Sequence, residues 1–178
     1  IGLAVAKRAA AFGMRISYYK RKRLDPIIEM ETGATFKRLD DLIRSADVIS
    51  IHTPLTRDTW HLIGQRELSM MKPDAVLINT SRGAVVDEKA LIKHLAAGKL
   101  AGAGLDVFEN EPDIPAELMQ MNNVVLTPHI GTDTVETRIS MTRESARNII
   151  DFFSDRQPFH VINPEVLQTG GADSRKRS

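Results

Sequence analysis

The segment from Leu77 to Leu91 constrains the fold of this chain more than any other. An apolar run, Ala75 to Ile78, follows a turn and predicts a buried strand. The strand breaks at Asn79-Thr80-Ser81, which places Arg82 at its carboxyl end, and the next pattern predicts a helix with Asp87 ahead of it as the cap. In an open parallel sheet, ligands bind outside the carboxyl ends of the strands, where a guanidinium can bind a carboxylate through two hydrogen bonds. The segment alone leaves open whether Arg82 binds a ligand or is an ordinary surface arginine.

Two further apolar runs are followed by side chains that could take part in chemistry. Residues 101–112 predict a strand followed by Glu111, and residues 122–132 predict a strand followed by His129. If these strands are parallel members of one sheet, Arg82, Glu111 and His129 converge on one crevice. Such a site would contain a cation that binds a carboxylate, a histidine that transfers a proton and a carboxylate that holds the histidine. These are the groups needed to oxidise a hydroxy acid or to reduce a keto acid.

Composition excludes several classes of protein. The chain has 178 residues, is 42% hydrophobic and carries a net charge of +1, which suits one ordinary soluble domain without a nucleic-acid or membrane partner. It has no cysteine, so disulfides and thiolate metal sites are excluded, and the spacing of its histidines does not suggest a metal site. No apolar run approaches the roughly 20 residues of a membrane span. The chain starts at Ile1 rather than Met, so a targeting segment cannot be judged, and we expect a cytoplasmic location.

Helical and strand patterns alternate along the chain. This alternation predicts an α/β fold, a doubly wound parallel sheet of the Rossmann type followed by a long C-terminal helix. We expect helices at 2–12, 40–45, 67–71 and 88–97, strands at 15–19 and 48–51, and a long helix at 132–153 with Asp133 as its cap. The Gly/Ser-rich residues 168–178 predict a disordered tail.

Three segments together resemble the D-isomer-specific 2-hydroxyacid dehydrogenase family. They are MMKPDAVLINTSRGAVVDEKAL, AGAGLDVFENEP and NVVLTPHIGT, and the family-like spacing covers residues 1–167. The resemblance implies that Arg82 holds the substrate carboxylate and that His129 is the acid/base. It also implies that Glu111, the glutamate directly before a proline, pairs with the histidine, with Glu109 as the less favoured alternative.

The resemblance also implies how the chain is divided. Residues 1–131 correspond to a dinucleotide-binding domain, 132–167 to a C-terminal helix and a segment that returns to the substrate domain, and 168–178 to the tail. Of the glycine fingerprint G-x-G-x-x-G only Gly2 is present, so the domain is expected to lack its first strand. With the strand order 3-2-1-4-5-6, strands two and four would then have no shared neighbour.

The preferred cofactor can be argued from the end of the second strand. NAD enzymes place Asp or Glu there, but this chain has Lys20, followed by Arg21, Lys22 and Arg23. These cations favour NADP(H) over NAD(H), although a solvated basic loop is the alternative interpretation. The full set of cofactor-binding candidates is Gly2, Lys20, Arg21, Thr53, Pro54, Thr80, Ser81, Arg82, Asp106, His129 and Gly131.

The function that the resemblance implies is hydride transfer between NAD(P)H and a small 2-keto or 2-hydroxy acid. The expected substrate is glyoxylate or hydroxypyruvate, and the expected assembly of the full-length enzyme is a homodimer. A formate dehydrogenase is disfavoured, because relatives with that activity carry glutamine in place of Glu111. Two alternatives stay open: a cofactor-sensing, corepressor-like binding protein of the same fold, and an inactive truncated product. We interpret the remaining histidines His61, His94 and His160 as ordinary polar positions, and place His52 beside the cofactor.

Overall fold

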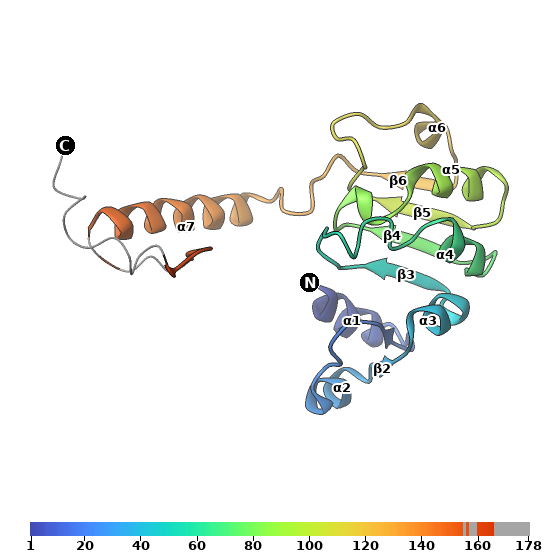
Figure 1. The fold of residues 1–178 in the computed structure, drawn as a ribbon, viewed down its shortest axis with the longest axis horizontal. Helices are drawn as coiled ribbons and strands as arrows, with labels where there is room; N and C mark the ends of the chain where they lie inside the picture. The colour runs from blue at the N-terminus through green and yellow to red at the C-terminus, as the bar shows by residue number, and fades with distance from the viewer. Residues whose placement is uncertain (155, 157–159, 166–178) are drawn as a thin grey trace. The chain divides into compact units, whose positions relative to one another are not determined.

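The computed structural model describes residues 1–154, 156 and 160–165 of the chain (Figure 1). It divides into two compact units, residues 1–131 and 132–178. The predicted tail, 168–178, lies outside the described residues. The α/β class is confirmed, since both sheets of the first unit are parallel and helices alternate with the strands.

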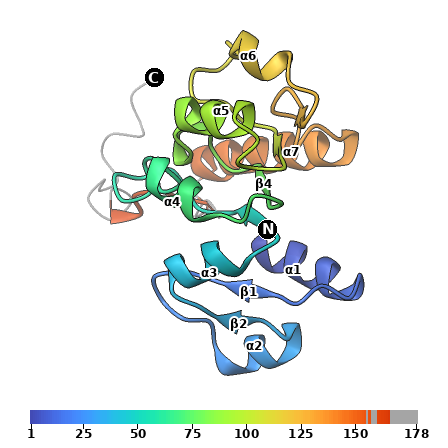
Figure 2. The same ribbon diagram turned by 90° about the vertical axis from the view of Figure 1, so that its right-hand side faces the viewer.

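The first unit contains two separate parallel sheets (Figures 1 and 2). The smaller sheet pairs β1 with β2, and the larger one has the order β3-β4-β5-β6. The strands are β1 (Ser17–Tyr18), β2 (Thr35–Phe36), β3 (Val48–Ile51), β4 (Val76–Asn79), β5 (Gly102–Leu105) and β6 (Val124–Leu126). In the predicted order, the family's first strand would separate β1 from β3. The division between the sheets falls at that position.

Most of the expected helices are present, with shifted ends. The helices are α1 (Gly2–Ala11), α2 (Pro26–Thr32), α3 (Leu39–Ser45), α4 (Gln65–Met70), α5 (Glu88–Ala96), α6 (Ala116–Met119) and α7 (Val135–Phe153), with a 3-10 turn η1 at Gly83–Val85. Helices α2 and α6 were not predicted. The cap of the long helix was predicted wrongly: Thr134 accepts the hydrogen bond from the Thr137 N–H, while Asp133 pairs with Arg138. None of the helices in the described residues is long and apolar enough to cross a bilayer.

The larger sheet carries the core of the first unit. Alternate residues of β3 and β4 are buried, among them Ile49 and Leu77, and they pack with Leu68 of α4 and Leu91 of α5. Burial of each such side chain contributes about 1.5–3 kcal/mol. Helix α4 contacts both α3 and α5, so one continuous packed layer supports the sheet.

The strand register aligns the carboxyl ends of the larger sheet. Ile51 pairs with Asn79, Asn79 with Leu105, and Leu105 with Leu126. The segments that follow these four residues therefore leave the sheet at one edge. The predicted site residues from Thr53 to Gly131 lie on these segments.

Candidate active site

The turn that carries Arg82 is shaped by Asn79, the last residue of β4. Asn79 is 1% exposed, and its Oδ1 accepts hydrogen bonds from the N–H of Ser81 (3.0 Å) and from its hydroxyl (2.8 Å). Its Nδ2 donates to the carbonyl oxygen of Arg82 at 2.9 Å. The side chain of Asn79 thus fixes the loop, and Arg82 is exposed at the sheet edge with Nη1 bonded to the Ser81 carbonyl oxygen.

His129 and Glu111 form a hydrogen-bonded pair at the same edge. His129 Nδ1 lies 2.7 Å from Glu111 Oε2, and Glu111 Oε1 accepts from the N–H of Phe108 at 2.9 Å. Burial raises the pKa of the Glu111 carboxyl, but the hydrogen bonds from His129 and Phe108 and the nearby charges of His129 and Arg82 outweigh it. The pKa therefore lies below its ordinary value, and Glu111 is an anionic partner for the imidazole. Glu109, the alternative partner, is bonded instead to His61.

Asp106 holds the loop that carries His129. Its Oδ1 accepts from the Thr127 hydroxyl (2.5 Å) and the Ile130 N–H (2.9 Å), and its Oδ2 accepts from the Gly131 N–H (3.0 Å). Burial raises the pKa of the Asp106 carboxyl. These three hydrogen bonds and the charge of His129 lower it by more, so the pKa lies below its ordinary value. His129 itself has φ of 54°, in the left-handed region. Asp106 thus stabilises an unusual backbone turn that presents the histidine.

Several features of the same edge fit a bound dinucleotide. The hydroxyl oxygen of Thr53 is buried and has no hydrogen-bond partner among the described residues, which leaves it available to a ligand or water. Gly2 opens α1, and a Cβ there would lie 3.3 Å from the His52 side chain. Burial lowers the pKa of His52, which favours its neutral form. Pro54 and Thr80 lie in the exposed loops after β3 and β4.

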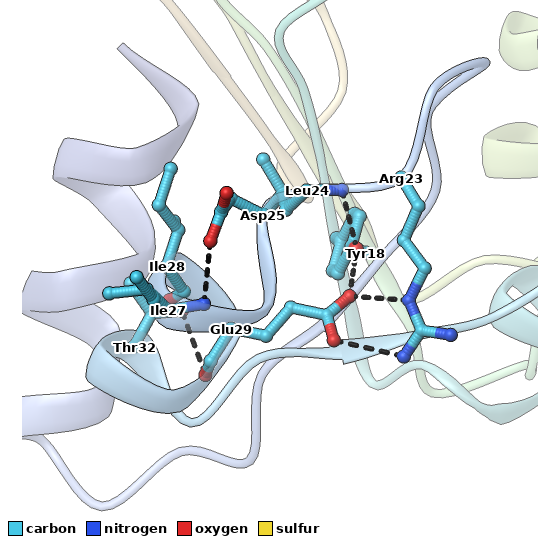
Figure 3. Close-up of polar contacts among 8 residues, drawn as sticks. All are labelled: Tyr18, Arg23, Leu24, Asp25, Ile27, Ile28, Glu29 and Thr32. Atoms are coloured by element: carbon cyan, nitrogen blue, oxygen red, sulfur yellow. Dashed lines mark hydrogen bonds and ion pairs between the residues drawn. The ribbon is translucent and has the colours of Figure 1, made fainter.

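In the basic loop after β1, Arg23 differs from the other cations because it forms an ion pair with Glu29 (Figure 3). Arg23 bonds Glu29 twice, Nε to Oε1 at 2.8 Å and Nη2 to Oε2 at 2.9 Å. The hydroxyl of Tyr18 donates to the same carboxylate and accepts from the N–H of Leu24. The hydrogen bonds from Arg23 and Tyr18 lower the pKa of Glu29 to about 2. Arg23 is therefore committed to a structural pair, a role that the sequence did not reveal.

The other cations of this loop remain exposed to solvent. Lys20 and Lys22 are exposed, and Arg21 lies 3.7 Å from Asp58 with both side chains 77% exposed. Such an exposed, distant ion pair is weak and can be exchanged for a stronger anion. Within the described residues, no group of three or more His, Cys, Asp or Glu side chains could hold a metal ion.

Comparison with known proteins gives a family for the first unit. Residues 1–131 match the family described as D-isomer specific 2-hydroxyacid dehydrogenase, NAD binding domain. The glyoxylate reductase of Thermococcus litoralis is 53% identical over 167 residues, which cover 94% of this chain and 50% of that protein. The chain thus spans about half the length of the curated relatives that it matches.

Solved structures agree with this assignment. The NADPH-dependent glyoxylate/hydroxypyruvate reductase of Sinorhizobium meliloti, in complex with NADP and malonate, superposes with a TM-score of 0.81 at 39% identity, covering 86% of this chain and 47% of that one. The D-lactate dehydrogenase of Lactobacillus jensenii with NAD+ gives a TM-score of 0.82 at 34% identity, covering 91% and 52%. Each of these relatives is an oxidoreductase by name.

Proposed function

The chain belongs to the D-isomer-specific 2-hydroxyacid dehydrogenase family, and from this premise we propose that it forms the cofactor-binding part of a reductase for small 2-keto acids. The observation that carries the proposal is the hydrogen-bonded pair of Glu111 and His129. The charge of Arg82 also lowers the pKa of the Glu111 carboxyl. Relatives named glyoxylate reductase and glyoxylate/hydroxypyruvate reductase support glyoxylate or hydroxypyruvate as the substrate.

The three side chains divide the work of reduction. A bound nicotinamide supplies the hydride. Arg82 binds the substrate carboxylate through two hydrogen bonds and orients the neighbouring carbonyl. His129 donates a proton to the carbonyl oxygen as C2 is reduced, which yields the 2-hydroxy acid. Glu111 stabilises the protonated imidazole that this step requires, and Asp106 holds the loop of His129 in place.

The test is turnover of glyoxylate and hydroxypyruvate by the full-length protein. His129→Ala should lower kcat by about 10²–10⁴-fold, the range for a general acid, while Arg82→Ala should chiefly raise the Michaelis constant for the keto acid. Arg66→Ala, on the exposed side of α4, is a matched arginine control and should leave both constants unchanged. Wild-type rates for His129→Ala would contradict the assignment.

The substrate panel also separates this function from its rivals. Small keto acids should be reduced faster than branched or aromatic ones, and the reverse order would contradict the substrate class. Absence of turnover with every 2-keto acid would favour a cofactor-sensing binding protein or an inactive product. A homodimer and a cytoplasmic location stay predictions for the full-length protein.

We also propose that NADP(H) is preferred over NAD(H). Lys20 and Arg21 are exposed cations at the end of β1. Among the described residues, Arg21 makes only the exposed, 3.7 Å pair with Asp58, and the carboxylate of Glu29 in α2 is already paired with Arg23. A charge-assisted bond to a 2′-phosphate is worth about 1.5–3 kcal/mol, which corresponds to about one to two decades in affinity. The fit is supported by the relative from Sinorhizobium meliloti, whose structure contains NADP.

Cofactor preference is measured as kcat/KM with NADPH and with NADH. The double variant Lys20→Gln/Arg21→Gln should lose about tenfold or more with NADPH and little with NADH, because only NADPH carries the 2′-phosphate. Lys89→Gln/Lys93→Gln, which removes two exposed cations from α5, is the matched control. A wild-type preference for NADH of about tenfold or more would show that the loop is only a solvated basic surface.

A further inference from the structure

A second histidine–glutamate pair lies beside the proposed active site. His61 Nε2 is 2.8 Å from Glu109 Oε1, and the two side chains are 32% and 17% exposed. The residues are 48 positions apart in the chain, and Glu109 stands two residues before Glu111. The proposed reaction assigns no role to either residue of this pair.

His61 is held in place from several sides. Its φ is 49°, in the left-handed region that residues other than glycine seldom adopt. Its N–H donates to the carbonyl oxygen of Ala84 at 2.9 Å, and its ring stacks on Trp60 with the centroids 4.8 Å apart. The hydrogen bond to Glu109 and the stacking on Trp60 hold the imidazole, and the bond to Ala84 holds its backbone.

The backbone beside Glu109 is packed equally closely. A Cβ on Gly83 of η1 would lie 1.9 Å from the carbonyl carbon of Phe108 and 2.4 Å from the nitrogen of Glu109. The N–H of Glu109 donates to Oε2 of Glu88 at 3.2 Å. Only glycine at position 83 permits this contact between η1 and the segment that leads to Glu111.

A second carboxyl group, that of Glu88, lies near Glu109. Glu88 of α5 is 9% exposed, and burial raises the pKa of its carboxyl. The hydrogen bond from the Glu109 N–H lowers this pKa, and the charge of Glu109 raises it. The two carboxyl groups are therefore close enough for the charge of Glu109 to act on Glu88. His61 is the group from the loop after β3 that pairs with Glu109 there.

We propose that His61 and Glu109 are positioning residues that hold the segment Phe108–Glu111 so that Glu111 reaches His129. The path is continuous: the Glu109 side chain is anchored to His61, the preceding Phe108 N–H bonds Glu111 Oε1, and Glu111 Oε2 bonds His129. This inference rests on the proposed reductase function. It adds a support on the side of Glu111, opposite to the support that Asp106 gives His129.

The kinetic test compares His61→Asn, Glu109→Gln and the double variant in the full-length protein. Asparagine tolerates the left-handed region, so His61→Asn removes the imidazole without forcing the backbone. A displacement of about 1 Å can cost about 100-fold, so each single variant should lower kcat by about ten- to a hundredfold. The Michaelis constant for the keto acid should change less than kcat, because Asn79 also holds the turn of Arg82.

Two further measurements distinguish the loss of the contact between His61 and Glu109 from a general loss of structure. The double variant should lose no more kcat than the worse single one, because both changes break the same contact. The alkaline limb of the kcat/KM profile should move to lower pH, since a displaced Glu111 no longer supports the protonated imidazole. His160→Asn, which changes a histidine 3.8 Å from Glu144 in the second unit, is the matched control and should alter neither measurement.

Hydrogen exchange measured by NMR supplies a readout that does not need turnover. In His61→Asn, the amides of Phe108 and Glu109 should exchange faster, while those of β4 and β5 stay as protected as in the wild type. If the wild-type protein reduces no keto acid, the proposed function fails, and the exchange pattern still decides whether the anchor exists. Unchanged amides at Phe108 and Glu109, an equal rise across the sheet, or a wild-type kcat and pH profile in His61→Asn would each overturn the proposal.

Discussion

Glu111 accepts a hydrogen bond on each carboxylate oxygen, one from the Phe108 backbone and one from His129. Because its pKa lies below the ordinary value of 4.5, the carboxyl is ionised throughout the pH range of an ordinary assay. The carboxylate is therefore a charged hydrogen-bond partner for His129 Nδ1 at every pH at which the enzyme would be measured. A reductase donates its proton from an imidazolium, and an anionic partner stabilises that form.

Glu111→Gln should move the pH profile of reduction toward lower pH. The amide keeps the size of the side chain but removes the negative charge, so the imidazole loses its proton earlier as the pH rises, and the alkaline limb falls earlier. The measurement is kcat/KM for glyoxylate against pH. Glu117→Gln on α6, also an exposed glutamate, is the control. An alkaline limb that does not move would show that Glu111 does not support the imidazolium.

At the scale of single residues, sequence reasoning could place those that lie in the loops after apolar runs. Arg82, Glu111 and His129 each come after a strand-like segment, so their positions could be predicted from the rule for parallel sheets. Asn79 was missed as the residue that shapes the Arg82 turn, although a buried amide at the end of an apolar run is a recognisable signal. The pair of His61 and Glu109 has no local pattern, because only the folded chain brings the two residues together.

At the scale of elements, length decided what could be predicted. Strands β3 and β4, with four residues each, show a periodic burial pattern, whereas β1 and β2 have two residues and therefore no period. Helix α2 carried readable signals, since Asp25 caps it, Pro26 is its first residue and Gly33 ends it with φ of 62°. Its seven residues were too few to show a clear apolar stripe.

The choice of cap for α7 shows a second limit at this scale. Asp133 and Thr134 are both favourable cap residues, and the sequence places them next to each other. The outcome depends on where each side chain can reach: Thr134 Oγ1 meets the Thr137 N–H at 3.2 Å, while Asp133 pairs with Arg138. Propensity therefore located the start of the helix to within two or three residues, and side-chain geometry fixed it.

At the scale of the whole molecule, each of the two units, taken by itself, leaves apolar surface uncovered. Its two longest helices, α1 with 10 residues and α7 with 19, contain no buried residue in the described part of the chain. Leu3 of α1 is 40% exposed and Phe153 of α7 is 81% exposed. Strands β1 and β3 belong to different sheets, so each has an edge whose backbone groups are not paired within a sheet. A stable protein covers such surfaces and pairs such edges.

Residues 1–178 expressed alone are therefore expected to be poorly soluble and inactive. The unpaired N–H and C=O groups along the edges of β1 and β3 can pair with the edges of other chains, which favours aggregation over a stable monomer. Val48, 43% exposed on β3, adds an apolar edge that favours aggregation. Size-exclusion chromatography, thermal melting and a reductase assay on the fragment test this expectation, with the full-length protein as the control. A soluble monomer that melts cooperatively and reduces glyoxylate would show that the separated sheets are stable without a further strand between β1 and β3.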